Sequence, residues 1–215
     1  FKEQKAVYAA RAIRLRNCYD DLCKAKKILI IGGGLVGVEL AGEICWKYKN
    51  EKEITIVHAH DRLIERNNEK TKNFAEKYLK KKGVKIMFKE RIVKAKNNKY
   101  VTDKGREIEA DMAFLCTGIT SNINFMRRHM SKHINEKNQI MVNDYLQLKG
   151  VNNIFAAGDL TDCKVEKTAQ NAEKQGKVVV KNICAIEKGE SLTEYSPIKT
   201  PLVISLGKFS GIFAW

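Results

Sequence analysis

The chain has 215 residues, 44% of them hydrophobic and 30% charged, which is typical of a globular protein long enough to bury a core. A formal net charge of +15 favours attraction to phosphates, nucleic acid or anionic lipid. The lysines are scattered among asparagines, as in KAKNNK, so we interpret them mainly as a solvated surface and treat nucleic-acid binding as the weaker hypothesis. No apolar run reaches the ~20 residues that a membrane-spanning helix needs.

The first part of the chain predicts alternating strands and helices. Residues 4–25 are expected to form an amphipathic helix that leads into the apolar run KILII. This run (27–31) is short, wholly apolar and followed by glycine, as in a central parallel strand. Further elements are expected in the order helix 35–49, strand 53–60, helix 71–83 and strand 84–88. The alternation predicts a βαβαβ unit with a parallel sheet.

The pattern changes after this unit. Short segments separated by turn residues cover 91–118 and predict an antiparallel meander that returns to a buried strand. Residues 150–160 predict a strand that ends in Gly-Asp, and residues 167–189 predict one long helix. For the apolar tail ISLGKFSGIFAW (204–215) we favour a packed strand or a dimer interface over contact with a membrane surface.

Cysteines and histidines do not form a metal-ligand pattern. The six cysteines include no Cys-x-x-Cys pair, which disfavours zinc and a disulfide framework and indicates a reducing compartment. Cys18 and Cys23 occupy positions i and i+5 of a predicted helix, which point in different directions, so we do not expect a redox pair. His129 and His133 lack a third ligand and are interpreted as surface histidines.

Three glycines follow the first predicted strand in a spacing that binds dinucleotides. Gly32, Gly34 and Gly37 form G-x-G-x-x-G between a strand and a helix, the context that this fingerprint requires. The first glycine permits the tight turn, the second lets backbone approach a pyrophosphate, and the third allows close packing of helix on strand. The alternative is a tight turn without ligand. The predicted contacts with the diphosphate are Gly32, Gly33, Gly34, Leu35, Val36 and Gly37.

The ribose end of the fingerprint departs from the usual pattern. An Asp or Glu is expected at the end of the second strand, about 20 residues on, to hold the 2′-hydroxyl of NAD. His58 stands there instead, 21 residues after Gly37. Because His58, His60 and Arg62 are compatible with a 2′-phosphate, NAD and NADP both stay open, with a slight preference for accepting NADPH. Simple exposure of both histidines at a strand end is the alternative.

Four landmarks occur in the order found in flavoprotein oxidoreductases that bind two dinucleotides. They are GGGLVGVE, the strand end Thr117-Gly118, the strand end Gly158-Asp159, and KTAQNAEKQG. From about residue 20 to 210 the chain resembles the pyridine nucleotide–disulfide reductase superfamily. KTAQ is similar to a segment of type II NADH dehydrogenases, and IVHAH, FLCTGI and PLVISLGKFSG resemble the apoptosis-inducing-factor-like branch that includes ferroptosis suppressor protein.

The resemblance implies an α/β fold in which a Rossmann-like NAD(P)-binding domain, a parallel sheet plus an antiparallel β-meander, is inserted in a discontinuous FAD-binding domain. Residues 1–24 would form a connecting helix, and residues 25–118 the NAD(P)H-binding domain. Residues 119–190 would form the C-terminal half of the FAD-binding domain, and 191–215 the start of a C-terminal or interface segment. The second glycine fingerprint that family members carry upstream is not in this sequence, so we expect it to bind NAD(P)H better than FAD.

The resemblance also implies further cofactor contacts. Asp159 would accept hydrogen bonds from a ribityl or pyrophosphate-side hydroxyl, unless it is only a turn aspartate. N–H groups of Thr168, Ala169 and Gln170, which open a helix, would face the pyrimidine edge of the flavin. Glu39 would lie near the nicotinamide, unless it is a solvated helix carboxylate. The implied residues are Glu39, Thr117, Gly118, Gly158, Asp159, Lys167, Thr168, Ala169 and Gln170.

The implied function is hydride transfer from NAD(P)H to FAD and on to a quinone-type acceptor. The cofactors would carry the reaction, so no catalytic side chain and no metal are expected. A catalytically silent NAD(P)-binding module is the alternative from another class, and a basic nucleic-acid binder is the weaker rival. We expect an intracellular protein, cytoplasmic or peripheral on a mitochondrial or other membrane, with membrane-surface association and a homodimer compatible with the apolar tail.

Overall fold

The computed structural model describes residues 4–197 and 201–214. The chain divides into two compact units, of which unit 1 comprises Phe1–Gly118 and Thr200–Trp215, and unit 2 comprises Ile119–Lys199. Each unit is described by itself.

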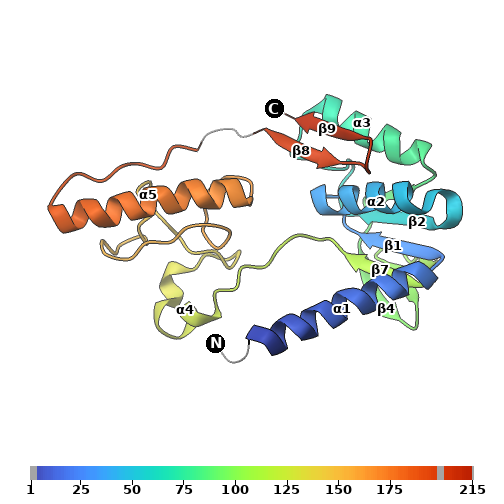
Figure 1. Cartoon of the computed structure of the whole chain (residues 1–215), viewed down its shortest axis with the longest axis horizontal. Coiled ribbons are helices and arrows are strands. Elements are labelled where there is room, and N and C mark those ends of the chain that lie inside the picture. The colour runs from blue at the N-terminus through green and yellow to red at the C-terminus, as the bar shows by residue number, and fades with distance from the viewer. Residues whose placement is uncertain (1–3, 198–200, 215) are drawn as a thin grey trace. The chain divides into compact units, whose positions relative to one another are not determined.

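A four-stranded parallel sheet in the order β3-β2-β1-β7 forms the centre of unit 1 (Figure 1). Its strands are β1 (Lys27–Ile31), β2 (Glu53–His58), β3 (Lys85–Phe88) and β7 (Met112–Leu115). Two helices, α2 (Leu35–Tyr48) and α3 (Glu69–Lys81), supply the connections of the predicted βαβαβ unit, with the short 3-10 turn η1 (Lys49–Glu51) after α2. Because β7 pairs with β1 on the side away from β2, the strand order reverses at β1. Open α/β sheets bind ligands at this point of their topology.

Alternation along β1 sends side chains to both faces of the sheet. Ile28 and Ile30 belong to the hydrophobic core that includes Ala41 and Ile44 of α2. Leu29 instead packs with Val57, Met87 and other residues on the second face. A strand that is covered on both faces reads as the continuous apolar run seen in the sequence.

The second face of the sheet is covered by the predicted meander. Its strands are β4 (Ile92–Lys96), β5 (Lys99–Thr102) and β6 (Glu107–Glu109), paired antiparallel in that order. Ile92, Tyr100 and Ile108, one from each strand, pack against the cluster around Leu29. The turn between β4 and β5 consists of Asn97 and Asn98, both at positive φ.

The tail forms a hairpin on the helical side of unit 1 (Figure 1). Strands β8 (Leu202–Ser205) and β9 (Gly211–Ala214) pair antiparallel and contact α2 and α3. Ile204 and Leu206 are fully buried in the same core as the helices. The predicted packed strand is therefore confirmed for the described part of the tail.

Two expectations about elements need correction. The first helix, α1 (Gln4–Lys24), forms as predicted, but its described side chains at 8–21 are exposed all round, so no packed amphipathic face is seen there. The predicted strand at 150–160 does not form. Phe155 makes only an isolated bridge with Gln147, flanked by hydrogen bonds from Leu148 to the carbonyl of Ile154 and from Ala156 to the carbonyl of Leu146.

Unit 2 is built on one long helix and irregular backbone. The helix α5 (Ala169–Lys188) begins at the Thr168 cap and ends at Gly189, which has φ +69°. A short helix α4 (Asn124–Met130) and the turn η2 (Ser131–His133) precede it. Their core is a separate apolar cluster that includes Ile123, Ile140, Leu146 and Leu148.

Candidate functional site

Two fingerprint glycines are required by close backbone packing. A Cβ on Gly32 would collide with the carbonyl group of Cys116, just after β7, and φ of Gly32 is +113°. A Cβ on Gly37 would collide with the carbonyl oxygen of Gly32. The loop therefore lies directly against the end of β7 on one side and the first turn of α2 on the other.

Gly34 is different, because its missing side chain leaves open space. A Cβ built there meets no atom within 4 Å, and its φ of −75° is ordinary for any residue. It caps α2 without a side-chain hydrogen bond, and the first turn of the helix carries no acidic residue. The N–H groups of the first turn have no intrahelical acceptor. The arrangement is an uncovered positive helix end, suited to a diphosphate.

Gly33 fastens the loop to the segment after β2. Its N–H donates to Nδ1 of His58 at 3.0 Å, and its carbonyl accepts from the N–H of Ile64 at 2.9 Å. A Cβ on Gly33 would collide with His58 and with Leu63. Gly33 is predicted as a diphosphate contact, but in this structure its N–H is used by His58. The additional glycine between Gly32 and Gly34 is the sequence signal for this contact.

His58 is buried and neutral in this arrangement. Its side chain is only 8% exposed, and burial lowers its pKa, with His60 and Arg91 adding to the fall and Glu65 and the backbone of Arg62 opposing it. Since Nδ1 accepts a hydrogen bond, Nε2 carries the proton. That atom is buried and has no partner in the part of the chain that the structure describes. Only His60 matches the alternative of simple exposure, and it pairs with Glu65 at 3.0 Å.

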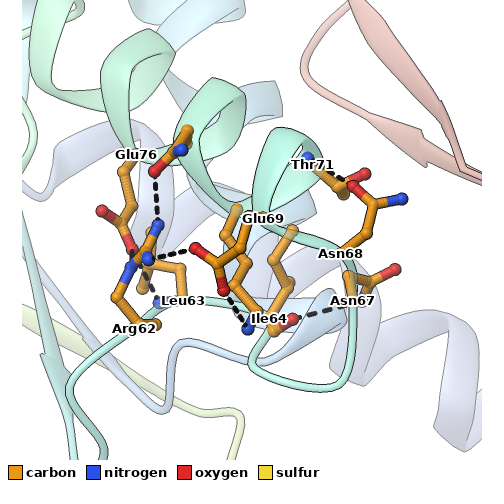
Figure 2. Close-up of polar contacts among 10 residues, drawn as sticks. Arg62, Leu63, Ile64, Asn67, Asn68, Glu69, Thr71 and Glu76 are labelled. Atoms are coloured by element: carbon orange, nitrogen blue, oxygen red, sulfur yellow. Dashed lines mark hydrogen bonds and ion pairs between the residues drawn. The ribbon is translucent and has the colours of Figure 1, made fainter.

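Arg62 is held by the helix that follows it (Figure 2). Its Nε donates to Glu76 at 2.9 Å, Nη1 to Glu69 at 2.7 Å and Nη2 to Asn73 at 2.6 Å. Glu76 also accepts from the N–H of Leu63 at 3.1 Å. Hydrogen bonds to Glu76 and then Glu69 raise the pKa of Arg62. The contact of Arg62 with a 2′-phosphate stays a prediction; in this structure three acceptors on α3 hold the guanidinium group.

Glu39 contacts the hairpin. Its Oε1 accepts from the N–H of Ser205 at 3.0 Å, and Glu43, one turn on, accepts from the hydroxyl group of Ser205. The role of Glu39 near a nicotinamide stays a prediction; the tail supplies a partner for Glu39 that spacing along α2 could not reveal. Thr117 and Gly118 are exposed at the end of unit 1, and Gly118 has φ +110°.

Unit 2 brings its predicted residues to one end of α5. The N–H of Gly158 donates to Gln175 at 2.6 Å, and its carbonyl accepts from the hydroxyl group of Thr161 at 2.9 Å. Lys167 donates to the carbonyl of Thr161 at 2.6 Å. Asp159 is exposed in the turn between them. The loop at 158–161 is thus tied to the helix start.

The start of α5 is also an open helix end. The Thr168 side chain accepts from the N–H of Asn171 at 3.3 Å, which leaves the exposed Ala169 and Gln170 in the first turn. No acidic residue lies in that turn. Gly158, Asp159 and the residues Lys167, Thr168, Ala169 and Gln170 therefore lie together in unit 2, as the sequence order implies.

No metal centre is found in the described residues. They contain no cluster of three or more His, Cys, Asp or Glu side chains that could hold an ion. His129 is exposed as expected, but His133 is buried with Nδ1 2.9 Å from the carbonyl of Lys149, so the surface interpretation of His133 is wrong. Cys18 and Cys23 are free and exposed. None of the described helices is long and apolar enough to cross a membrane.

The sequence profile of the pyridine nucleotide-disulphide oxidoreductase family matches residues 2–176. The chain belongs to this family. The predicted superfamily is confirmed. Within the family, Apoptosis-inducing factor homolog B of Dictyostelium discoideum is 35% identical over 92% of this chain and 58% of that protein. Ferroptosis suppressor protein 1 of Mus musculus is 31% identical over 90% of this chain and 56% of that protein. The chain spans little more than half the length of these relatives.

Solved structures of the same fold support the α/β prediction. The water-forming NADH oxidase from Lactobacillus brevis, bound to NADH, is similar with a TM-score of 0.71 and 24% identity over 88% of this chain and 42% of that chain. An NAD-dependent persulfide reductase from A. fulgidus is similar with a TM-score of 0.71 and 23% identity over 88% of this chain and 36% of that chain. At this level of identity the likeness shows the fold, and the Rossmann-like class predicted for the chain is confirmed.

The residues of unit 1 fit the pyridine nucleotide that the family name implies. The open space at Gly34 lies at a helix end that needs an anion, and the buried Nε2–H of His58 needs an acceptor. Gly34 and His58 are connected through Gly33, whose N–H donates to the His58 ring. The residues that the sequence implied for a flavin site lie in unit 2, in the turn at Asp159 and at the open start of α5.

Proposed function

We propose that this chain contains the nucleotide-binding domain and part of the flavin site of an oxidoreductase that takes hydride from NAD(P)H, passes it to FAD, and reduces a quinone-type acceptor. Family membership supports the oxidoreductase class. The observation that carries the nucleotide half is the uncovered start of α2 with open space at Gly34. The solved relative bound to NADH has the same fold.

In unit 1 the proposed work of the protein is to bind and orient the nucleotide. The N–H groups of Leu35, Val36 and Gly37 would donate to the diphosphate, where the helix dipole favours negative charge. The Nε2–H of His58 would donate to a ribose hydroxyl and so gain its missing partner. Gly33, bonded to His58 and Ile64, would hold these two contacts at a fixed separation.

In unit 2 the proposed work is to hold part of the flavin. The exposed carboxylate of Asp159 would accept hydrogen bonds from flavin hydroxyls. The N–H groups of Ala169 and Gln170 would lie at the pyrimidine edge, where a helix start stabilises negative charge. When both cofactors are bound they supply hydride transfer and then electron delivery, while the residues named here supply position and charge.

The acceptor and the surface that meets it are further parts of the proposal. The hairpin exposes Val203, Phe209 and Phe213, which are 67%, 85% and 67% exposed. An apolar surface of this kind suits a lipophilic quinone, a membrane surface or a second copy of the chain. Quinone reduction is the activity that we assign to the complete protein, which we place inside the cell or at a membrane surface.

Anaerobic titration of the complete protein tests the proposal. We expect the purified protein to show flavin absorbance, to bleach on addition of NADH or NADPH, and to recover its colour when a short-chain quinone is added. A protein that binds nucleotide but has no flavin would support the alternative of a silent NAD(P)-binding module. A protein that binds neither cofactor would contradict both.

A further inference from the structure

The segment after β2 carries no net charge, although the chain as a whole is strongly basic. Residues 58–76 contain four carboxylates and four permanent cations, in a chain of net charge +15. The carboxylates are Asp61, Glu65, Glu69 and Glu76, and the cations are Arg62, Arg66, Lys70 and Lys72. The segment follows the strand end at which dinucleotide-binding folds distinguish the two nicotinamide cofactors.

Two of its cations, Arg62 and Lys72, are paired with carboxylates of the same segment. Lys72 donates to Glu69 at 2.9 Å, and His60 pairs with Glu65 at 3.0 Å. Arg62 donates to both Glu69 and Glu76, and its side chain is 28% exposed, whereas the side chain of Glu76 is only 13% exposed. A positive group that is already bound by two carboxylates offers little attraction to an incoming phosphate.

Hydrogen bonds connect this cluster to the nucleotide loop. Leu63, next to Arg62, donates to Glu76 (Figure 2). Ile64 donates to the carbonyl of Gly33 in the fingerprint. Arg62 thus precedes by two residues Ile64, which contacts the loop that would bind the diphosphate. An arginine near this strand end can accommodate the 2′-phosphate of NADP, but only with its N–H fork free.

We propose that Glu69 and Glu76 withhold Arg62 from a 2′-phosphate, so that the protein selects NADH over NADPH. The proposal rests on the proposed function and names the substrate of that same site. His58, the neutral neighbour, provides a donor for a hydroxyl but no positive charge for a phosphate.

The decisive variant frees Nη1 and Nη2 of Arg62 and keeps the hydrogen bond from Nε to Glu76. Glu69→Ala/Asn73→Ala removes the acceptors of Nη1 and Nη2, while Glu76 still holds Nε. Both positions are exposed, Asn68 still caps α3, and alanine favours helix, so the fold should persist. Circular dichroism verifies the helix content. Glu107→Gln, on β6, is the matched control for an added positive charge elsewhere in unit 1.

Calorimetric titration of the complete protein with NADH and with NADPH gives the readout. We expect the unmodified protein to bind NADH about tenfold tighter than NADPH, and the double variant to gain about tenfold in NADPH affinity with NADH unchanged, the size of one hydrogen-bonded charge contact. Adding Arg62→Met to the double variant should abolish the gain, and Glu107→Gln should give none.

Other outcomes overturn the inference. Equal affinity for the two nucleotides in the unmodified protein, no gain in the double variant, or a gain that survives Arg62→Met would each contradict it. Binding of both nucleotides without selectivity would leave the proposed function intact, whereas binding of neither would contradict the proposed function as well.

Discussion

Single residues of the loop divide into those that shape it and those that leave room for a ligand. Gly37 and Gly32 are in backbone contact with each other, whereas Gly34 faces open space. The same residue type therefore serves packing at two positions and access at the third. The distinction gives separate expectations for stability and for nucleotide binding.

Substitution of two glycines should separate these roles. The Cβ of Gly34→Val meets no atom of the protein within 4 Å, but valine is a poorer helix cap than glycine, so we expect the free energy of unfolding to fall by no more than about 1 kcal/mol. NADH affinity should fall about tenfold or more, because a helix-end contact with the diphosphate is lost. Gly37→Val should cost at least about 1–3 kcal/mol of stability, because the strand and helix must separate. Denaturant unfolding and NADH titration measure both effects, and an unaltered NADH affinity in Gly34→Val would contradict the assignment.

His58 should make stability depend on pH. Its pKa lies below the ordinary value of 6.5 because the ring is buried, so the unfolded chain binds the proton more readily than the folded one. The stability that the neutral ring contributes to the folded state is therefore fully present above pH 6.5, and it is lost as the pH falls from 6.5 towards the pKa of the folded state. His58→Asn keeps an acceptor for Gly33 but does not titrate. Unfolding free energies at several pH values should decrease more steeply on acidification in the unmodified protein than in the variant, and parallel profiles would disprove the account.

The sequence predicted where His58 lies but not what surrounds it. Spacing from Gly37 located it at the end of β2, and the missing acid was visible at once. Burial of the ring, its bond to Gly33 and the engagement of Arg62 by Glu69 and Glu76 depend on how the segment 59–68 folds back. No local pattern encodes those contacts, since they join residues whose spacing is irregular.

At the scale of elements, the hairpin β8–β9 packs on α2, a contact that the sequence did not predict. Gly42 allows this contact, because a Cβ there would come within 2.7 Å of the Cα of Leu206. Strong periodic elements such as β1 and α3 were predicted within a few residues of their bounds. The strand predicted at 150–160 is wrong. Its composition favours a strand, but the run makes only an isolated β-bridge between Phe155 and Gln147.

Gly42→Ala should loosen the hairpin. The added methyl group must displace Leu206, at a cost of about 1–3 kcal/mol. Hydrogen exchange at 202–214 should become faster, while exchange in the strands of the parallel sheet changes less. Gly176→Ala in α5 is the matched control, because a Cβ there meets nothing within 4 Å and alanine favours helix. Unchanged protection of the hairpin in Gly42→Ala would show that this contact is not tight.

At the scale of the whole molecule, each cluster of buried apolar residues in the described chain lies within one unit. The clusters around Ile28 and Leu29 belong to unit 1, and the cluster around Leu148 belongs to unit 2. The proposed nucleotide contacts and the proposed flavin contacts likewise fall in different units. The pyridine nucleotide alone should therefore affect one unit directly.

Hydrogen exchange of the complete protein with and without saturating NADH tests the central claim, that the start of α2 binds the nucleotide. We predict slower exchange at 32–38 and 58–64, where the diphosphate and ribose would lie, with a smaller effect at the start of α5. Protection confined to other segments, with 32–38 unchanged at saturation, would contradict the claim.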